Sequence, residues 1–305
     1  MIKVDLITGF LGAGKTTFIK EYARYFMEQG QKVGILENDY GAVNVDMLLL
    51  QDLRGENCEL EMVAGGCDSD CHKRRFKTKL ISMGMSGYKR VLIEPSGIFD
   101  MDEFFDTLRE SPLDNWYEIG SVICVLDAKT NLSSVEEKFI LSSELSNSGC
   151  IVLSKLDKAS DDEVQQTLEL VKQISEENHC KRELSNLVVN KNWNDFTEDD
   201  FYKIANSGYQ ICDYVKKISA MDAGYETLYF LEHGLGEESL REKVHELFSD
   251  KECGNVLRIK GFFLENDCWY ELNATKDDLS IHPVKAGQDV LIVIGHNLDK
   301  TKICM

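Results

Sequence analysis

Three glycines, a lysine and two threonines lie close together near the amino terminus, in the segment GFLGAGKTT at residues 9–17. Their spacing fits the pattern G-x-x-x-x-G-K-[ST], in which glycine backbone N–H groups surround a phosphate chain and a lysine neutralises its charge. We predict that Lys15 reaches the β- and γ-phosphates of a nucleotide and that the Thr16 hydroxyl binds Mg²⁺. The predicted phosphate-binding residues are Gly9, Gly12, Ala13, Gly14, Lys15, Thr16 and Thr17.

Acidic residues follow two other apolar segments. Glu94 comes directly after the apolar run at 91–93 and opens the tetrapeptide EPSG, whose Gly97 fits a backbone that approaches the γ-phosphate. In P-loop enzymes an acid at the end of a second buried strand holds Mg²⁺, usually through water. An ordinary solvated strand end is the alternative for Glu94. The segment ENDYGAVNVD at 37–46 supplies two aspartates that could orient water or Mg²⁺. The predicted catalytic residues are Lys15, Asp39 and Glu94, and the predicted Mg²⁺ ligands are Thr16, Asp46 and Glu94.

The tetrapeptide SKLD at residues 154–157 is the candidate for reading the nucleotide base. A buried carboxylate at Asp157 could accept hydrogen bonds from the N1 and N2 donors of guanine, which adenine lacks. The usual pattern in guanine-specific P-loop proteins is N-K-x-D, and here Ser154 replaces the asparagine while Lys155 and Asp157 remain. We therefore predict GTP as the nucleotide, with weaker discrimination against ATP than a full N-K-x-D sequence would give.

A second group of potential ligands lies in the segment AGGCDSDCH at residues 64–72. Cys67, Cys71 and His72 form a soft nitrogen and sulfur set that suits Zn²⁺ or Co²⁺, and Glu37 could complete it. The alternative is that Cys71 and His72 only cap the basic helix that follows. For that helix, residues 73–79, we favour a solvated face held by neighbouring acids over a partner-binding surface.

The elements that must position these residues follow from hydrophobic periodicity. A strand at 2–7 precedes the glycine loop and a helix at 18–26 follows it, which is the context that the phosphate-binding pattern requires and a chance glycine turn would lack. Further apolar strands alternate with helices up to residue 189, which predicts an α/β fold: a P-loop NTPase parallel sheet covered by helices. After about residue 222 the strands predominate, so we predict a P-loop domain at 1–222 and a smaller C-terminal α+β domain at 223–305.

Composition excludes several classes of function. The chain of 305 residues carries a formal net charge of −19, which argues against non-specific binding to nucleic acid and to anionic membranes. We expect no transmembrane segment and no signal peptide, since a strand begins almost at the first residue. The ten cysteines are scattered, as in a cytoplasmic protein without disulfides, and most, including Cys124, Cys150 and Cys212, are expected in the core.

The ordered set of motifs resembles the CobW family of P-loop GTPases, which is related to UreG and HypB. GFLGAGKTT, ENDYGAVNVD, the cysteine loop, IEPSG, VLDA and SKLD occur in that order, and GNVLRIKGFF and IGHNLD are similar to the family's second domain. Two departures stand out. The family usually has G-C-x-C-C where this chain has only Cys67 in register, and many members have glutamate at the position of Ala42.

The resemblance implies a GTP-hydrolysing metallochaperone or metal insertase, with GTP and Mg²⁺ as cofactors and Zn²⁺ or Co²⁺ as cargo. Its partners would be GTP or GDP and a client metalloprotein or cobalamin-related protein, and a homodimer is a candidate assembly. In the alternative function the chain is a GTP-driven switch or assembly factor for such an enzyme and carries no metal itself. A small-molecule kinase would need an acceptor-binding insert and a base, and the sequence offers neither.

Overall fold

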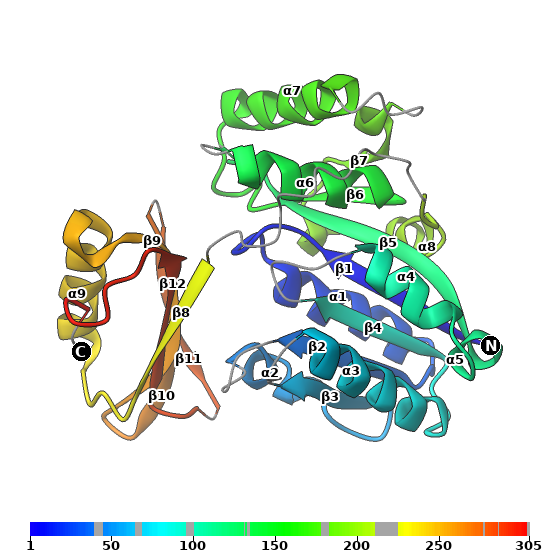
Figure 1. Ribbon diagram of the computed structural model, residues 1–305, viewed down its shortest axis with the longest axis horizontal. Helices are drawn as coiled ribbons and strands as arrows, with labels where there is room; N and C mark the ends of the chain where they lie inside the picture. The colour runs from blue at the N-terminus through cyan, green and yellow to red at the C-terminus, as the bar shows by residue number, and fades with distance from the viewer. Residues whose placement is uncertain are drawn as a thin grey trace. The chain divides into compact units, whose positions relative to one another are not determined.

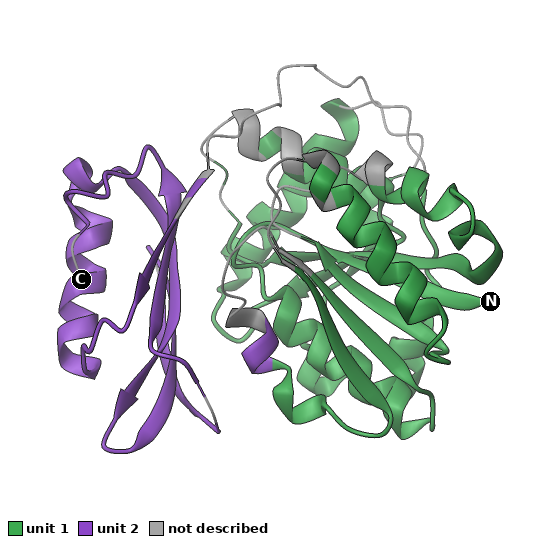
Figure 2. Cartoon of the chain, turned by 60° about the horizontal axis from the view of Figure 1, so that its bottom comes forward, with its two compact units in different colours: residues 1–42, 50–217 green, residues 43–49, 218–305 purple. Residues whose placement is uncertain are grey.

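Apolar segments alternate with amphipathic helices over the first part of the chain, and they build a sheet of seven parallel strands (Figure 1). The computed structural model describes residues 1–39, 45–64, 69–95, 101–130, 132, 135–177, 183–210, 225–276, 278–285 and 287–303. The chain divides into two units, one of residues 1–42 and 50–217 and one of residues 43–49 and 218–305 (Figure 2). The domain boundary predicted at 222 falls among residues 211–224, outside the described residues, and stays a prediction.

The first unit follows a βα order through its length. Its strands lie in the order β3-β2-β4-β1-β5-β6-β7, so that β1 has a neighbour on each side. Its described elements are β1 (Ile2–Thr8), α1 (Lys15–Glu28), β2 (Val33–Asp39), β3 (Cys58–Ala64), α3 (Ser69–Gly84), β4 (Arg90–Pro95), α4 (Met101–Arg109), α5 (Leu113–Trp116), β5 (Tyr117–Asp127), α6 (Val135–Asn147), β6 (Cys150–Ser154), α7 (Asp161–Glu177), β7 (Val188–Val189) and α8 (Glu198–Ala205), with short 3-10 turns at Gln51–Leu53, Leu184–Leu187 and Trp193–Asp195.

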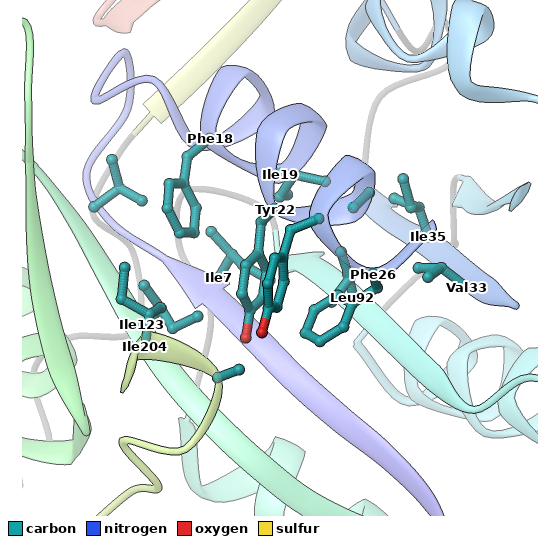
Figure 3. Packing of buried hydrophobic residues seen from close by; sticks show 14 of the residues in the cluster. Ile7, Phe18, Ile19, Tyr22, Phe26, Val33, Ile35, Leu92, Ile123 and Ile204 are labelled. Carbon is teal, nitrogen blue, oxygen red and sulfur yellow. The ribbon is translucent and has the colours of Figure 1, made fainter. Parts of the chain in front are cut away.

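Successive side chains of each strand leave the sheet on opposite faces, and helices cover both faces. On one face Leu92 of β4 packs with Phe18, Tyr22 and Phe26 of α1 in a buried cluster (Figure 3). The neighbouring strand residues, such as Ile93, contribute instead to a cluster that contains residues of α3, α4 and α5. A third cluster joins β5 and β6 to α6 and α7. The predicted α/β fold with a helix-covered parallel sheet is therefore confirmed.

The second unit is a five-stranded antiparallel sheet in the order β11-β10-β9-β12-β8. One face packs against α9 through Leu240, Val244 and Leu247, which lie in one buried cluster with Ile259 and Phe263 of β9. The predicted smaller α+β unit is thus present. Its described elements are α2 (Val45–Leu49), β8 (Tyr225–Leu231), α9 (Glu237–Ser249), β9 (Asn255–Glu265), β10 (Cys268–Thr275), β11 (Leu279–Val284) and β12 (Val290–His296), with a 3-10 turn at Lys251–Cys253.

The short helix α2 belongs to the second unit, although residues of the first unit precede and follow it in the chain (Figure 2). Leu48 and Leu49 of α2 pack against the cluster of Phe262, Val290 and Ile292 on the sheet face opposite α9. Nothing in the sequence at 45–49 predicts this partner, because five residues carry too short a pattern.

The centre of the first unit contains a buried ion pair between Asp5 of β1 and Arg90 of β4. The hydroxyl of Tyr22 donates to Asp5 Oδ2 at 2.8 Å, and the backbone N–H of Ser121 donates to Asp5 Oδ1 at 2.8 Å. The Arg90 guanidinium also lies 4.3 Å from the ring centroid of Phe26, a cation–π contact. Asp5 is fully buried and Arg90 is 5% exposed, so each charge depends on these partners.

The hydrophobic pattern of the sequence did not predict β3, β11 and α8. Strand β3 is one edge of the first sheet, and β11 is one edge of the second. Edge strands carry polar side chains that obscure the alternation of apolar and polar residues. In β3, Glu59 pairs with Lys32 at 2.9 Å and Glu61 pairs with Lys79 at 2.7 Å. Helix α8 begins with a capping box of Thr197 and Asp200, a sequence signal that could have located it.

In the part of the chain that the structure describes, no helix is both long and apolar enough to cross a lipid bilayer.

Arg90→Leu should lower the free energy of unfolding by about 3–5 kcal/mol, because it leaves the Asp5 carboxylate buried without its counter-charge. Urea denaturation followed by circular dichroism measures the change. Adding Asp5→Asn to Arg90→Leu should recover part of the loss, since the unpaired charge is then removed. Lys77→Ala is the control, because Lys77 pairs with Glu110 at 2.6 Å on an exposed helix face, and it should cost under about 1 kcal/mol. Equal losses for Arg90→Leu and Lys77→Ala would contradict the role given to the buried pair.

Candidate nucleotide and metal site

The glycine loop connects β1 to α1 at the carboxyl end of the sheet. Gly9 has a φ of 139°, and a Cβ there would lie 2.1 Å from the carbonyl oxygen of Val125, so only glycine fits. Gly14 adopts the left-handed conformation, with φ of 92°, directly before the first residue of α1. The turn between them is closed by a hydrogen bond of 3.1 Å from Ala13 N–H to Phe10 C=O. The loop thus runs into a helix N-terminus, the arrangement that binds phosphate.

Lys15, Thr16 and Glu94 come together beside this loop. The Thr16 hydroxyl lies 2.9 Å from Glu94 Oε2 and 3.1 Å from Oε1, and Lys15 Nζ lies 4.0 Å from Glu94 Oε1. Lys15 also donates a hydrogen bond of 3.0 Å to the carbonyl oxygen of Gly9. All three side chains are less than a tenth exposed. A threonine hydroxyl and a carboxylate at this separation form a pair of hard oxygen ligands, which fits Mg²⁺.

Glu37 of β2 lies level with Glu94 of β4, since the two residues are paired in the parallel register. Paired residues leave the sheet on the same face, so both carboxylates project toward the face that α1 covers. Glu37 is 2% exposed. Asp39 ends β2 and Asp46 lies in α2, but the side chains of both lie outside the described residues, as does Gly97. Their predicted roles stay predictions.

The base-reading segment follows β6, two strands from β1. Lys155, with a φ of 54°, forms an ion pair of 2.6 Å with Asp127 at the end of β5. The Ser154 hydroxyl is buried and donates to the carbonyl oxygen of Leu126 at 3.3 Å. The Ser154 hydroxyl is therefore engaged inside the fold, and its predicted role in binding the nucleotide stays a prediction. Asp127 is the aspartate of the motif VLDA, and its contact with Lys155 was not predicted from the sequence.

Asp157 is exposed, in a turn after Lys155, whereas a buried carboxylate was predicted. The short turn after β6 leaves it at the surface. Nearby, the half-buried ring of Trp193 comes within 3.3 Å of the position that a Cβ on Gly14 would take. Its ring centroid lies 6.0 Å from that of Phe18 in α1. The turn after β7 thus packs against the end of the phosphate loop.

The predicted transition-metal residues are only partly described. Cys71 is half-buried in the first turn of α3, while Cys67 and the side chain of His72 lie outside the described residues. Within the described ranges no group of three or more potential metal ligands is found. In α3, Lys77 and Lys79 are paired with Glu110 and Glu61, as expected for a solvated basic face.

Several of the other cysteines are core thiols. Cys124 and Cys150 are buried as predicted, Cys58 is buried as well, and Cys212 lies outside the described residues. Burial raises the pKa of Cys58 to about 11 and the pKa of Cys150 to about 12. These thiols stay protonated at neutral pH and are poor metal ligands there, because the thiolate is the ligand form.

A family model described as the CobW/HypB/UreG nucleotide-binding domain matches residues 3–181, more than half of the chain. The chain belongs to this family. The zinc chaperone YeiR of Escherichia coli is 30% identical over 164 residues, which is 52% of this chain and 48% of YeiR. The zinc chaperone YjiA of the same organism is 28% identical over 169 residues, which is 53% of this chain and 52% of YjiA. The match thus spans about half the length of these curated relatives.

A solved structure of a zinc-bound triple mutant of the YjiA GTPase aligns with 99% of this chain and 96% of its own chain, with 16% identity and a TM-score of 0.41. The family membership rests on the sequence match over residues 3–181 and not on this likeness.

The nucleotide should change the fluorescence of Trp193, because this ring packs against the end of the phosphate loop. We expect a change in tryptophan emission when GDP with Mg²⁺ is added to the wild type. Trp269→Phe removes a tryptophan of the second unit and should keep the change, while Trp193→Phe should abolish it. A response that survives Trp193→Phe would show that the loop after β7 does not report on the phosphate site.

Proposed function

We propose that this chain binds and hydrolyses GTP and that its nucleotide state controls the delivery of a transition metal, with Zn²⁺ as the first candidate and Co²⁺ as the second. The observation that carries the proposal is the contact of Thr16 with Glu94 next to Lys15, at the carboxyl ends of adjacent strands. This is the arrangement in which a P-loop protein holds Mg²⁺ and the terminal phosphates. The family membership and the names of the zinc-chaperone relatives support it.

In the proposed reaction the chain contributes binding and electrostatic stabilisation. Lys15 would leave the carbonyl of Gly9 for the β- and γ-phosphates and neutralise the charge that develops on the transferred group. Thr16 and Glu94, with Asp46, would hold Mg²⁺, which would supply positive charge against the phosphates. Asp39 would orient the attacking water. The two buried carboxylates at Glu37 and Glu94 would repel phosphates that arrive without a metal ion, so the site would favour phosphates together with a cation.

Guanine specificity would come from Asp157. Its exposed carboxylate can accept from N1 and N2 of guanine, while Lys155, held by Asp127, would cover one face of the base. Because the Ser154 hydroxyl is engaged with Leu126, the contact that asparagine makes in N-K-x-D proteins is lacking. GTP should therefore be preferred over ATP by a smaller factor than in those proteins.

Metal delivery would use Cys67, Cys71 and His72, with Glu37 as a fourth candidate. This cysteine loop lies in sequence between the segment 37–46 and the segment 94–97, both of which approach the γ-phosphate in the proposed GTP-bound state. Loss of that phosphate on hydrolysis would change the order of these segments and so the affinity for metal. The recipient would be a metalloprotein.

Asp157→Asn should weaken GTP binding about tenfold or more, because hydrogen bonds to charged groups contribute about 1.5–3 kcal/mol. The same variant should bind XTP better than the wild type does, since an amide can donate to the extra carbonyl of xanthine. Competition titrations with GTP, ATP and XTP, combined with release of inorganic phosphate from GTP, measure both effects. Lys15→Ala is the inactive control. Equal wild-type affinities for ATP and GTP would refute the assignment as a GTPase.

The wild type should bind Zn²⁺ stoichiometrically, with an affinity that rises with pH as the thiols lose their protons and that changes when GTP is added. The double variant Cys67→Ser, Cys71→Ser should lose this binding, whereas Cys268→Ser, at an exposed cysteine of the second unit, should keep it. Calorimetry with GTP, with GDP and without nucleotide is the measurement, and by linkage Zn²⁺ must change the GTP affinity by the same factor. Equal Zn²⁺ binding by wild type and double variant would favour the switch or assembly factor that carries no metal.

A further inference from the structure

Glu144, near the end of α6, is an ionisable residue buried next to the start of the phosphate loop. Its carboxyl group accepts a hydrogen bond of 2.8 Å from the Thr8 hydroxyl and one of 3.3 Å from the backbone N–H of Gly9, both at Oε1. The residue is 5% exposed, and 135 positions separate it from Gly9 in the sequence. No motif of the sequence singles it out.

Gly9 is held on its other sides as well. Its carbonyl oxygen accepts from Lys15 Nζ at 3.0 Å, and its Cα faces the Val125 carbonyl so closely that a Cβ would lie 2.1 Å from that oxygen. Gly9 is therefore contacted through its N–H by α6, through its Cα by β5 and through its C=O by α1. The hydrogen bond that Gly9 N–H donates to Glu144 is the contact that orients the peptide between Thr8 and Gly9, where the chain leaves β1.

Of the two carboxyl oxygens of Glu144, only Oε1 has hydrogen-bond partners in the described structure. Oε2 is buried and has no hydrogen-bond partner in the part of the chain that the structure describes. Burial raises the pKa of Glu144, although Thr8, Lys15 and Gly9 oppose this rise. A carboxyl group is a costly side chain to bury in this way, and leucine would fill the space without that cost. The only contacts in the described structure that require an acceptor here are those to Thr8 and Gly9.

We propose that Glu144 is a positioning residue for phosphate binding, which acts by fixing the Thr8–Gly9 peptide so that the later amides of the loop converge on the phosphates. The inference rests on the proposed function only in that the ligand is a nucleotide. Glu144 acts through Gly9 and does not itself touch the ligand. What it supplies is an acceptor oxygen, so a side chain that keeps the acceptor but not the charge should serve as well.

Two substitutions distinguish a role of Glu144 as a hydrogen-bond acceptor from a role in packing alone. Glu144→Gln keeps an oxygen for Thr8 and Gly9, whereas Glu144→Ala removes it. Tyr117→Phe is the matched control. The Tyr117 hydroxyl donates a buried hydrogen bond of 2.7 Å to the carbonyl oxygen of Leu80 in the same unit. Tyr117 lies at the start of β5, whereas Val125, which contacts Gly9, lies near the end of that strand. Should Glu144→Ala fail to fold, Thr8→Val removes one of the two partners and keeps the second.

The experiment measures the Kd for mant-GDP and the kcat for GTP in these variants, together with amide hydrogen exchange over residues 9–16 in the absence of nucleotide. We expect Glu144→Ala to raise the Kd by about tenfold or more and to speed the exchange, while Glu144→Gln and Tyr117→Phe stay within about threefold of the wild type. Thr8→Val should fall between these.

Two outcomes overturn the inference: Glu144→Ala binds and exchanges like the wild type, or Glu144→Gln is impaired as strongly as Glu144→Ala. A wild type that binds neither GDP nor GTP refutes the proposed function instead, and the exchange rates of the nucleotide-free variants still decide whether Glu144 holds the loop.

Discussion

The buried pair of Asp5 and Arg90 is the interaction on which the first unit depends. It joins β1 to β4, and through Tyr22 and Ser121 it also joins α1 and β5. Arg90 further approaches the carbonyl of Ala205 at the end of α8, at 3.5 Å. Because β1 and β4 are tied at this level, their carboxyl ends stay in register a few residues later, where the phosphate loop begins and where Glu94 lies. A charge pair in the core thus sets the geometry of a site that it does not touch.

Residues that follow strands could be predicted because the rule behind them is local. Lys15, Thr16 and Glu94 each stand at a fixed distance from an apolar run, and parallel strands bring such positions to one edge of the sheet. Glu144 and Trp193 were not found, since their roles arise from packing between elements far apart in the chain. The exposure of Asp157 was also missed, because a strand pattern does not reveal how the following turn is oriented.

Three acidic residues near the site, Glu94, Glu144 and Asp127, differ in whether they act through charge or through hydrogen bonding. Glu94 faces the hydroxyl of Thr16 and the ammonium of Lys15, so it is matched to cations. Glu144, on the other side of the loop, meets only a hydroxyl and an N–H through Oε1. Asp127 pairs with Lys155 and so sets the start of the base-reading turn. The roles of Glu94 and Asp127 therefore depend on their charge, whereas the role of Glu144 depends only on an acceptor oxygen, which an amide would also supply.

The assignment of α2 to the second unit has a consequence for how the protein is made. A ribosome releases residues 45–49 long before Phe262, Val290 and Ile292, against which Leu48 and Leu49 pack. Domains generally fold as units during synthesis, beginning with the N-terminal one. Here the first unit can complete its sheet while two leucines still lack their partners. A nascent chain would expose this pair until residues 262–292 have left the ribosome.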